Sequence, residues 1–169
     1  MANPKLYTYP SPLAGYENAP PLSSSQGPNE DYPPVVGLSP AYKKFPDPID
    51  NAAHPGGFDA HIYFDQNDPD ETKFATELRE RIQREFPELR IYKLWDRPIG
   101  PHTQAMFEVN VLTTTQFGAF IPWLIINRGP LRALLHPNTR DHLRDHTQRA
   151  TWLGGEVPVN TEMFTRRGL

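Results

Sequence analysis

Cysteine is absent from the 169 residues of this chain, and its absence excludes several kinds of site. Disulfide frameworks, zinc fingers, iron–sulfur clusters and thiolate nucleophiles all require it. The chain also lacks an apolar run near the roughly 18 residues of a membrane-spanning helix, and its longest run, Ala119–Ile126, is interrupted by Pro122. No basic segment followed by an apolar one marks a secretory signal, so we expect a cytoplasmic protein.

An excess of positive charge is lacking as well. Seventeen Lys and Arg oppose twenty Asp and Glu, which leaves a net charge of −3 and no basic block. Proteins that bind nucleic acids normally show a basic patch or stripe. We therefore expect neither nucleic acid nor a membrane as a partner.

Proline, by contrast, is abundant: the chain has 20, more than twice the roughly 5% of an average protein. Twelve of the 20 lie in residues 1–55, so the rest of the chain has nearly ordinary density. This distribution predicts a proline-rich N-terminal arm over residues 1–55, extended or packed on the domain or on a partner subunit. The predicted domain covers residues 56–158, and residues 159–169 are expected to form an unstructured tail.

The pattern of apolar residues in the domain predicts an α+β fold. Alternation predicts strands over residues 58–65, 91–95, 104–112 and 131–136. Capping signals at Asp68 and Thr113 predict helices that end near residues 86 and 127, and a polar helix is expected over 141–152. The order β-α-β-β-α-β is that of the ferredoxin-like fold, an antiparallel sheet of order 4-1-3-2 with both helices on one face.

The sheet face that the helices leave open carries the chemistry. Alternation turns the small and apolar positions of the strands toward the helices and the polar positions toward the open face. The open face then receives His61, Tyr63, His102, Gln104, Met106, Glu108, Asn110, Arg132, Leu134 and His136.

Three histidines and a glutamate on adjacent strands can meet around one metal ion if the registers agree, because neighbouring strands lie about 4.8 Å apart. Imidazole, with or without a carboxylate, suits Fe, Zn, Cu or Ni, and two His plus one carboxylate is typical of non-haem Fe(II) oxygenases. Histidines on a half-exposed strand face are also compatible with an ordinary polar surface. The pattern alone leaves both interpretations open.

Eight short segments of the domain occur together, in the same order, in one known family. They are Phe58–Phe64, Pro98–His102, Met106–Val109, Pro122–Leu124, Arg128–Gly129, His136–Thr139, Asp145–Thr147 and Trp152–Gly154. Together they resemble the DOPA 4,5-dioxygenase family over residues 57–155. The resemblance implies a ferredoxin-like extradiol dioxygenase that opens the catechol ring of L-DOPA with O₂ between C4 and C5.

The resemblance carries the histidine positions of the family onto His61, His102, His136 and His146. The first three are open-face residues that alternation selects independently. We expect Fe(II), or Zn or another divalent metal in the isolated protein, held by His61, His102 and His136, or by two of them with Glu108. Glu108 or His146 is then the expected catalytic base for the catechol proton.

Face and charge suggest the remaining contacts. Tyr63 and Trp95 are expected to line the pocket of the substrate ring, and Arg132 to pair with a substrate carboxylate. An open site face is poorly shielded from water, so we expect a homodimer, or the arm, to cover it.

The chain departs from the family pattern at two places. Arg140 stands where many relatives have glycine, and Thr103 and Gln104 follow His102 where relatives have prolines and other small residues. Two other functions therefore stay open: a non-catalytic ferredoxin-like binding module of the same family, and a metal-dependent hydrolase that uses zinc and consumes no O₂.

Overall fold

The computed structural model describes residues 7–20, 37–52 and 56–166. The chain divides into two units, residues Met1–Ser39 and residues Pro40–Leu169. The described part of the first unit contains turns and no helix or strand. Much of the predicted arm, residues 1–6, 21–36 and 53–55, lies outside the described residues, and its boundary at residue 55 stays a prediction.

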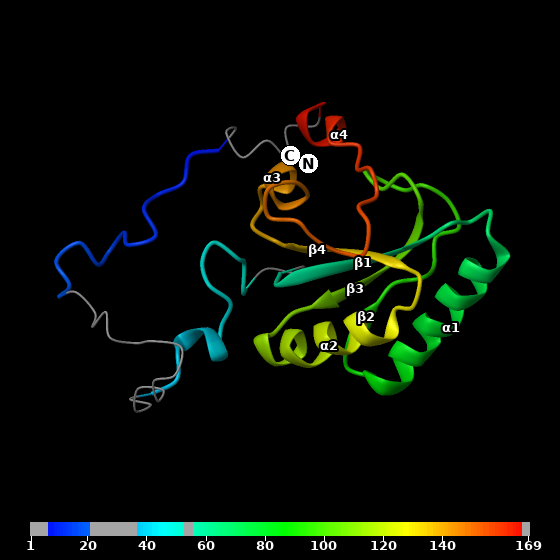
Figure 1. Cartoon of the computed structure of the whole chain (residues 1–169), viewed down its shortest axis with the longest axis horizontal. Helices are drawn as coiled ribbons and strands as arrows, with labels where there is room; N and C mark the ends of the chain where they lie inside the picture. Colours follow the sequence, from blue (N-terminus) through cyan, green and yellow to red (C-terminus); the bar gives the residue numbers. More distant parts are fainter. Residues whose placement is uncertain (1–6, 21–36, 53–55, 167–169) are drawn as a thin grey trace, which may run out of the picture. The chain divides into compact units, whose positions relative to one another are not determined.

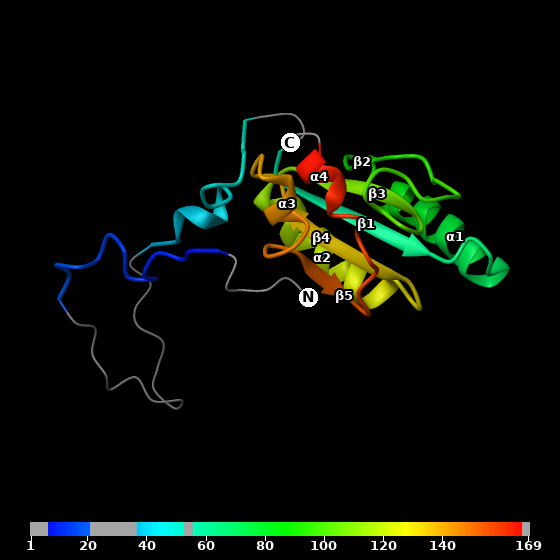
Figure 2. The same cartoon turned by 90° about the horizontal axis from the view of Figure 1, so that it is seen from above.

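An antiparallel sheet forms the centre of the second unit (Figures 1 and 2). Its five strands have the spatial order β2-β3-β1-β4-β5. The predicted order 4-1-3-2 is confirmed, and one further strand extends the sheet beside β4. The strands are β1 (Phe58–Phe64), β2 (Arg90–Ile91), β3 (Ala105–Val111), β4 (Arg132–Pro137) and β5 (Thr151–Leu153).

The two long helices, α1 (Pro69–Glu85) and α2 (Thr114–Asn127), lie together on one face of the sheet, as predicted (Figure 1). The Asp68 side chain caps α1 by accepting hydrogen bonds from the first-turn backbone, and Pro69 occupies the first position. Thr113 and Gln116 form the predicted capping box of α2. The core between the layers contains the predicted strand positions Ala60, Ile62, Phe64, Ala105, Phe107, Val109, Val111, Ala133 and Leu135.

The predicted helix over residues 141–152 is wrong in its second half. Helix α3 covers only His142–Asp145, and the chain then turns into β5, which pairs with β4. Thr151 and Trp152 are β-branched and aromatic residues that favour a strand, and Leu153 packs against the core. The second predicted strand, 91–95, is also shorter: after Ile91 only Trp95 pairs, through a single bridge to Met106.

The face opposite α1 and α2 is covered by the chain itself. The backbone N–H of Asn160 donates to the Pro101 carbonyl over 2.8 Å, and the Thr103 hydroxyl donates to the Pro158 carbonyl over 2.6 Å. Val157 thereby lies in a small apolar cluster with Tyr63. Beyond it the tail that was expected to lack structure contains the short helix α4 (Glu162–Arg166), drawn with α3 on the side of the sheet away from α2 in Figure 1.

Residues 157–164 shield the site face from water, so a second subunit is not needed for that purpose. The homodimer stays a prediction. The described helices include none that is long and apolar enough to cross a bilayer.

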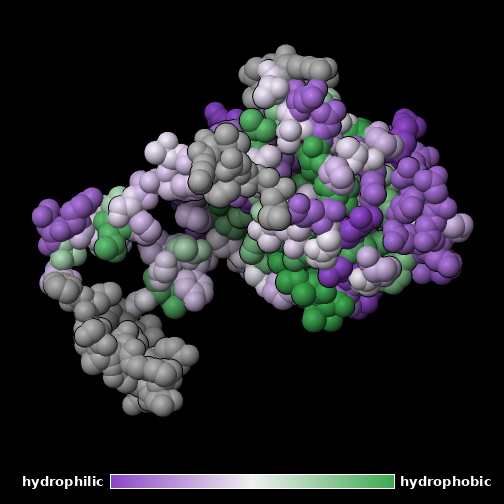
Figure 3. Space-filling view, turned by 45° about the horizontal axis from the view of Figure 1, so that its top comes forward, coloured by the Kyte–Doolittle hydropathy of each residue, from purple (hydrophilic) through white to green (hydrophobic). Residues whose placement is uncertain are grey.

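The outer surface of α1 is strongly hydrophilic, and Figure 3 shows such residues gathered on that side of the molecule. Lys73 and Glu77, Arg81 and Glu85, and Glu80 and Arg84 form ion pairs one turn apart along this helix. Pairs of this kind support a helix by a few tenths of a kcal/mol each, about 0.2–0.5 kcal/mol. They mark α1 as a solvated outer layer of the domain.

Part of the predicted arm packs on the domain. The segment that begins with a 3₁₀ turn (Pro40–Tyr42) brings Phe45 to within 5.2 Å of the Phe58 ring and 6.0 Å of the Phe117 ring. Asn51 closes this segment, because its side-chain oxygen accepts from the Phe45 N–H and its amide donates to the Phe45 carbonyl. Phe45 is only 6% exposed, so this otherwise mostly exposed segment is anchored on the domain by one buried aromatic side chain.

We expect Phe45→Ala to lower the free energy of unfolding by about 3 kcal/mol, the cost of emptying a buried aromatic site. Tyr42→Ala is the matched control, because Tyr42 is 68% exposed and its loss should change stability by about 0.5 kcal/mol or less. Urea unfolding followed by fluorescence measures both. Equal effects of the two substitutions would contradict the packing of Phe45.

Candidate metal centre

Four histidine rings from different segments meet on the face of the sheet opposite α1 and α2. His61 comes from β1 and His136 from β4, and their ring centroids are 5.1 Å apart. His102, from the turn before β3, lies 4.1 Å from His61, and His146, at the end of α3, lies 4.0 Å from His136. His102 and His146 close the group at 5.9 Å. The structure thus brings together all four predicted histidines.

Strand register places two carboxylates beside these rings. Glu108 lies opposite His61 in the β1–β3 pair, and Asp59 lies opposite His136 in the β1–β4 pair. Asn110 joins them, because its side-chain amide donates to Asp59 Oδ1 over 2.6 Å and to Glu108 Oε1 over 2.8 Å.

Asp59 is a residue of this group that the sequence pattern did not lead us to expect. Its position two residues before His61 puts it on the same strand face, so the alternation that selects His61 also selects Asp59.

His146 lies beside the other histidines because hydrogen bonds and an ion pair fix the turn before it. The buried Asp145 carboxylate accepts from the Thr139 backbone N–H over 2.8 Å and from the Thr139 hydroxyl over 2.7 Å. Arg149 completes the anchor with an ion pair of 3.0 Å to Asp145. These contacts hold the short helix α3 against the end of β4, and His146 follows as its C-cap.

The Nδ1 atoms of three histidines have outer hydrogen-bond partners. Nδ1 of His136 donates to the Pro137 carbonyl over 3.0 Å, and Nδ1 of His146 donates to the His142 carbonyl over 2.9 Å. Because a carbonyl only accepts, both neutral rings carry their proton on Nδ1 and have a bare Nε2. Nδ1 of His102 is bonded to the Tyr63 hydroxyl over 2.6 Å, which leaves Nε2 as the ligand atom there too.

His61 supplies the test of whether a metal fits this centre. Its Nε2 lies 3.0 Å from the bare Nε2 of His136, so without a metal His61 must place its proton between them. Its Nδ1 is then a buried acceptor without a hydrogen-bond partner among the described residues. If both Nε2 atoms held a cation, the His61 proton would be on Nδ1, and a Glu108 carboxylate oxygen lies 3.8 Å from that nitrogen. A metal ion would therefore satisfy the hydrogen-bonding and ligand atoms of these side chains better than their contacts with one another do.

The spacing of the two nitrogens agrees with this conclusion. Two nitrogens that each bind one ion at about 2.1 Å are at most about 4.2 Å apart, and these two are 3.0 Å apart. Within the described part of the chain two ligand sets are close enough to hold an ion, His61 with His102 and His146, and Asp59 with His61 and His136. His61 belongs to both sets.

Burial determines the protonation states of the four histidines and of Glu108. Loss of solvent, followed by the neighbouring histidines, lowers the pKa of His102 to about 4 and that of His146 to about 2. The same causes lower the pKa of His61 well below its ordinary value, and burial lowers that of His136. All four imidazoles are therefore neutral at pH 7, which is the state that binds a metal. Burial and the nearby Asp59 raise the pKa of Glu108 to about 7.

Of the three predicted substrate contacts, only Tyr63 has a described contact with one of the four histidines, and the role of all three stays a prediction. Tyr63 is fully buried and is bonded to His102. Arg132 donates to the Gln104 side chain over 2.9 Å and lies four residues before His136, about 13 Å along the strand. Trp95 packs at the Tyr63 end of the face and stacks on Tyr92 at 6.0 Å.

Arg140, one departure from the family pattern, has a structural explanation. Its φ of 69° is in the left-handed region that favours glycine, which is the residue expected at this position. The guanidinium bonds to the Asp50 carboxylate through Nη2 at 2.7 Å and Nε at 2.9 Å. Arg140 thus ties residues 46–52 to the turn that leads to His146.

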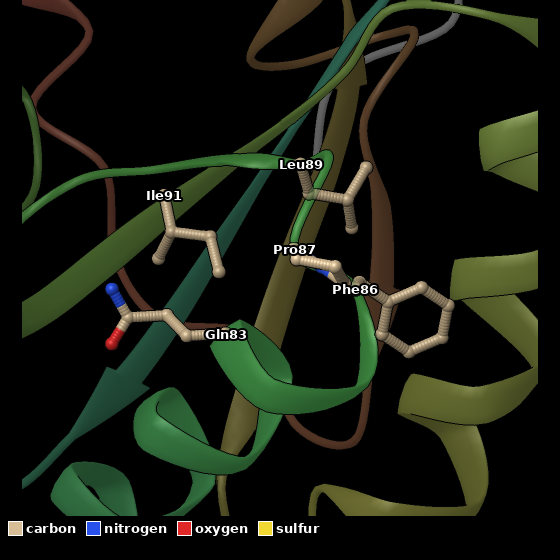
Figure 4. A pocket seen from close by; sticks show the side chains of 5 residues that line it. All are labelled: Gln83, Phe86, Pro87, Leu89 and Ile91. Atoms are coloured by element: carbon tan, nitrogen blue, oxygen red, sulfur yellow. The ribbon is translucent and has the colours of Figure 1, made fainter.

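A shallow pocket of about 190 Å³ lies elsewhere, at the end of α1 (Figure 4). Ile91, which lines it, pairs with the core position Val109, so the pocket belongs to the helix-covered side of the sheet. It carries no titratable side chain and no part of the histidine group. Its lining is Gln83, Phe86, Pro87, Leu89 and Ile91.

An antiparallel sheet covered by helices on one face, with four neutral histidines beside two carboxylates on the other, defines a protein of ferredoxin-like α+β architecture whose residues could hold a metal ion. Residues 58–163 match the model of the Dopa 4,5-dioxygenase family, and the match includes every histidine of the centre, Asp59 and Glu108. The chain belongs to this family, and the resemblance drawn from its motifs is confirmed.

Individual relatives agree with this assignment. The chain is 38% identical over 105 residues to the DOPA 4,5-dioxygenase of Amanita muscaria, a match that covers 59% of this chain and 46% of that protein. It is 54% identical over 176 residues to an "Uncharacterized 21.2 kDa protein" of Botryotinia fuckeliana, covering 98% of this chain and 96% of the relative. A crystal structure from Nostoc punctiforme, described as a "putative dioxygenase", has a TM-score of 0.60 and 36% identity over 66% of this chain and 92% of its own.

We expect the metal-free protein to lose stability as the pH falls below 6.5. A histidine of the unfolded chain takes up its proton near pH 6.5, whereas folded His102 does so only near pH 4. Between these values the unfolded state binds more protons, so acid favours unfolding by about 1 kcal/mol per pH unit for each such histidine. Glu108, whose folded pKa is raised, acts in the opposite direction but is outnumbered.

Urea unfolding from pH 7 to pH 4.5 measures this slope. His102→Gln should flatten it by the share of one histidine, because the variant has no proton to take up at that position. Stability independent of pH over this range would contradict the neutral, buried state of the histidines.

We also expect a divalent metal to raise the melting temperature of the metal-free protein, and EDTA to reverse the rise. At a hundredfold excess over the dissociation constant the gain is about 2.7 kcal/mol, or roughly 5 °C or more. His61→Ala should abolish it, because His61 belongs to both ligand sets. His142→Ala is the control that keeps the shift, since its side chain is in neither set and its carbonyl is retained.

Proposed function

We propose that this chain is an extradiol ring-cleaving dioxygenase that acts on L-DOPA or a related catechol with O₂ at a mononuclear Fe(II) centre. The convergence of the four neutral histidines with Asp59 and Glu108 carries this proposal. Family membership and the Amanita relative support the choice of reaction and substrate.

His61 and His136 would hold the metal, with Asp59, His102 or His146 as further ligands. When bound, such an ion supplies a Lewis acid for the two catechol oxygens and a redox centre for O₂. Asp59 with His61 and His136 is a set of two histidines and one carboxylate, the combination common in non-haem Fe(II) oxygenases.

Glu108 is the better of the two expected bases. Its pKa near 7 lets it accept the catechol proton at neutral pH, whereas His146, with a pKa near 2, is a weak acceptor. Asn110 holds one carboxylate oxygen of Glu108, and the other lies toward His61. The Glu108 side chain is 18% exposed, so a substrate can approach it from solvent.

Solvent access favours the β2–β3 side of the face as the entrance. Elsewhere on the face the Phe164 ring of α4 lies 4.7 Å from the His146 ring, and Val157 packs with Tyr63, Met106 and Leu134. Tyr92 and Trp95, both partly exposed and mutually stacked, are the aromatic residues that would line this entrance. Because burial closes the remaining sides, water is kept from the reacting atoms.

Anaerobic loading with Fe(II), followed by L-DOPA and air, tests the proposal. We expect one O₂ consumed per L-DOPA and a yellow product, with His61→Ala reducing turnover at least about a hundredfold, since loss of a ligand removes the metal. Arg132→Gln is the control and should keep the rate within about threefold, because Arg132 lies at the other end of the strand.

Two results would overturn the proposal. One is full activity in His61→Ala. The other is a zinc-loaded protein that hydrolyses substrates while the Fe(II) form consumes no O₂, which identifies a hydrolase. Asp59→Asn and His102→Gln then separate the two ligand sets, because only the variant in the occupied set loses metal.

A further inference from the structure

Tyr63 carries a hydroxyl that no substrate reaches. The residue has 0% exposure and lies in an apolar cluster with Met106, Leu134 and Val157. Burial raises the pKa of Tyr63 above its ordinary value, so the hydroxyl keeps its proton. A buried hydroxyl is costly unless it is hydrogen-bonded, and the Tyr63 hydroxyl meets His102 Nδ1 at 2.6 Å.

His102 depends on this bond more than the other histidines do on theirs. It lies outside the regular strands, in a turn whose backbone makes single bridges to Ile99 and Val159. His136 and His146 are oriented by backbone carbonyls, whereas the partner of His102 is a side chain. The orientation of this ring is therefore set by one residue of β1.

We propose that Tyr63 is a positioning residue that holds the His102 ring with Nε2 available to the metal. This inference rests on the metal centre of the proposed function. A neutral hydroxyl can donate to a bare Nδ1 or accept from a protonated one. The same bond therefore persists through the change of tautomer that metal binding at Nε2 requires. Outer partners of ligating histidines are worth about 10–100-fold in metal affinity.

Titration of the metal-free protein with Co(II), followed by calorimetry and by the visible spectrum, tests the inference without turnover. We expect Tyr63→Phe to weaken Co(II) binding about 10–100-fold and to change the spectrum. Trp152→Phe is the matched control. The Trp152 ring lies 5.7 Å from the Tyr63 ring, and among the described residues its side chain makes no hydrogen bond to His102, so its loss disturbs the packing and leaves the affinity within about threefold.

A double-mutant cycle separates positioning from general damage to the fold. In a His102→Gln background, Tyr63→Phe should cause no further loss of Co(II) affinity, because its effect acts through the His102 ring. An equal loss in both backgrounds, or wild-type affinity in Tyr63→Phe, overturns the inference and leaves the proposed function standing. A wild-type protein that binds no Co(II) and no Fe(II) overturns both.

Discussion

The pairing of β1 with both β3 and β4 is the constraint on which the site depends. Side chains alternate along a strand, so a slip of one residue in either ladder would turn His136 or Glu108 into the core beneath α1 and α2. The buried residues Ile62 and Phe107, which face each other under the helices, oppose such a slip because they would have to enter the polar face. The apolar layer on one side of the sheet thus holds the register of the polar layer on the other.

Burial keeps the histidines of the centre neutral, and it also lowers the stability of the protein. Removing water keeps the imidazoles neutral, and it leaves His61 with a nitrogen that nothing in the described chain satisfies. A buried polar atom of this kind costs about 1–3 kcal/mol. Stability is therefore lower in the metal-free state than the packing of the sheet alone would provide, and a bound cation recovers the difference.

Alternation within strands was sufficient to predict His61 and His136 on one face, and capping signals were sufficient for α1 and α2. Alternation shows which face of the sheet a side chain is on, but it does not show whether another segment covers that side chain. Tyr63 was therefore expected beside the substrate, although Val157 packs over it. That cover, and β5, depend on contacts between distant residues such as Leu134 and Trp152, which local periodicity does not encode. Only His146 came from the family motifs alone, because its position is set by the turn at the end of α3 rather than by a strand period.

The ligand candidates lie far apart along the chain, from Asp59 and His61 to His136 and His146. A zinc finger, whose ligands are close in sequence, gathers its ion while it folds. Here the sheet must close before any two of these strands present their nitrogens to the same point. If this centre holds a metal ion, the chain would therefore have to form its sheet before the ion could bind to these side chains.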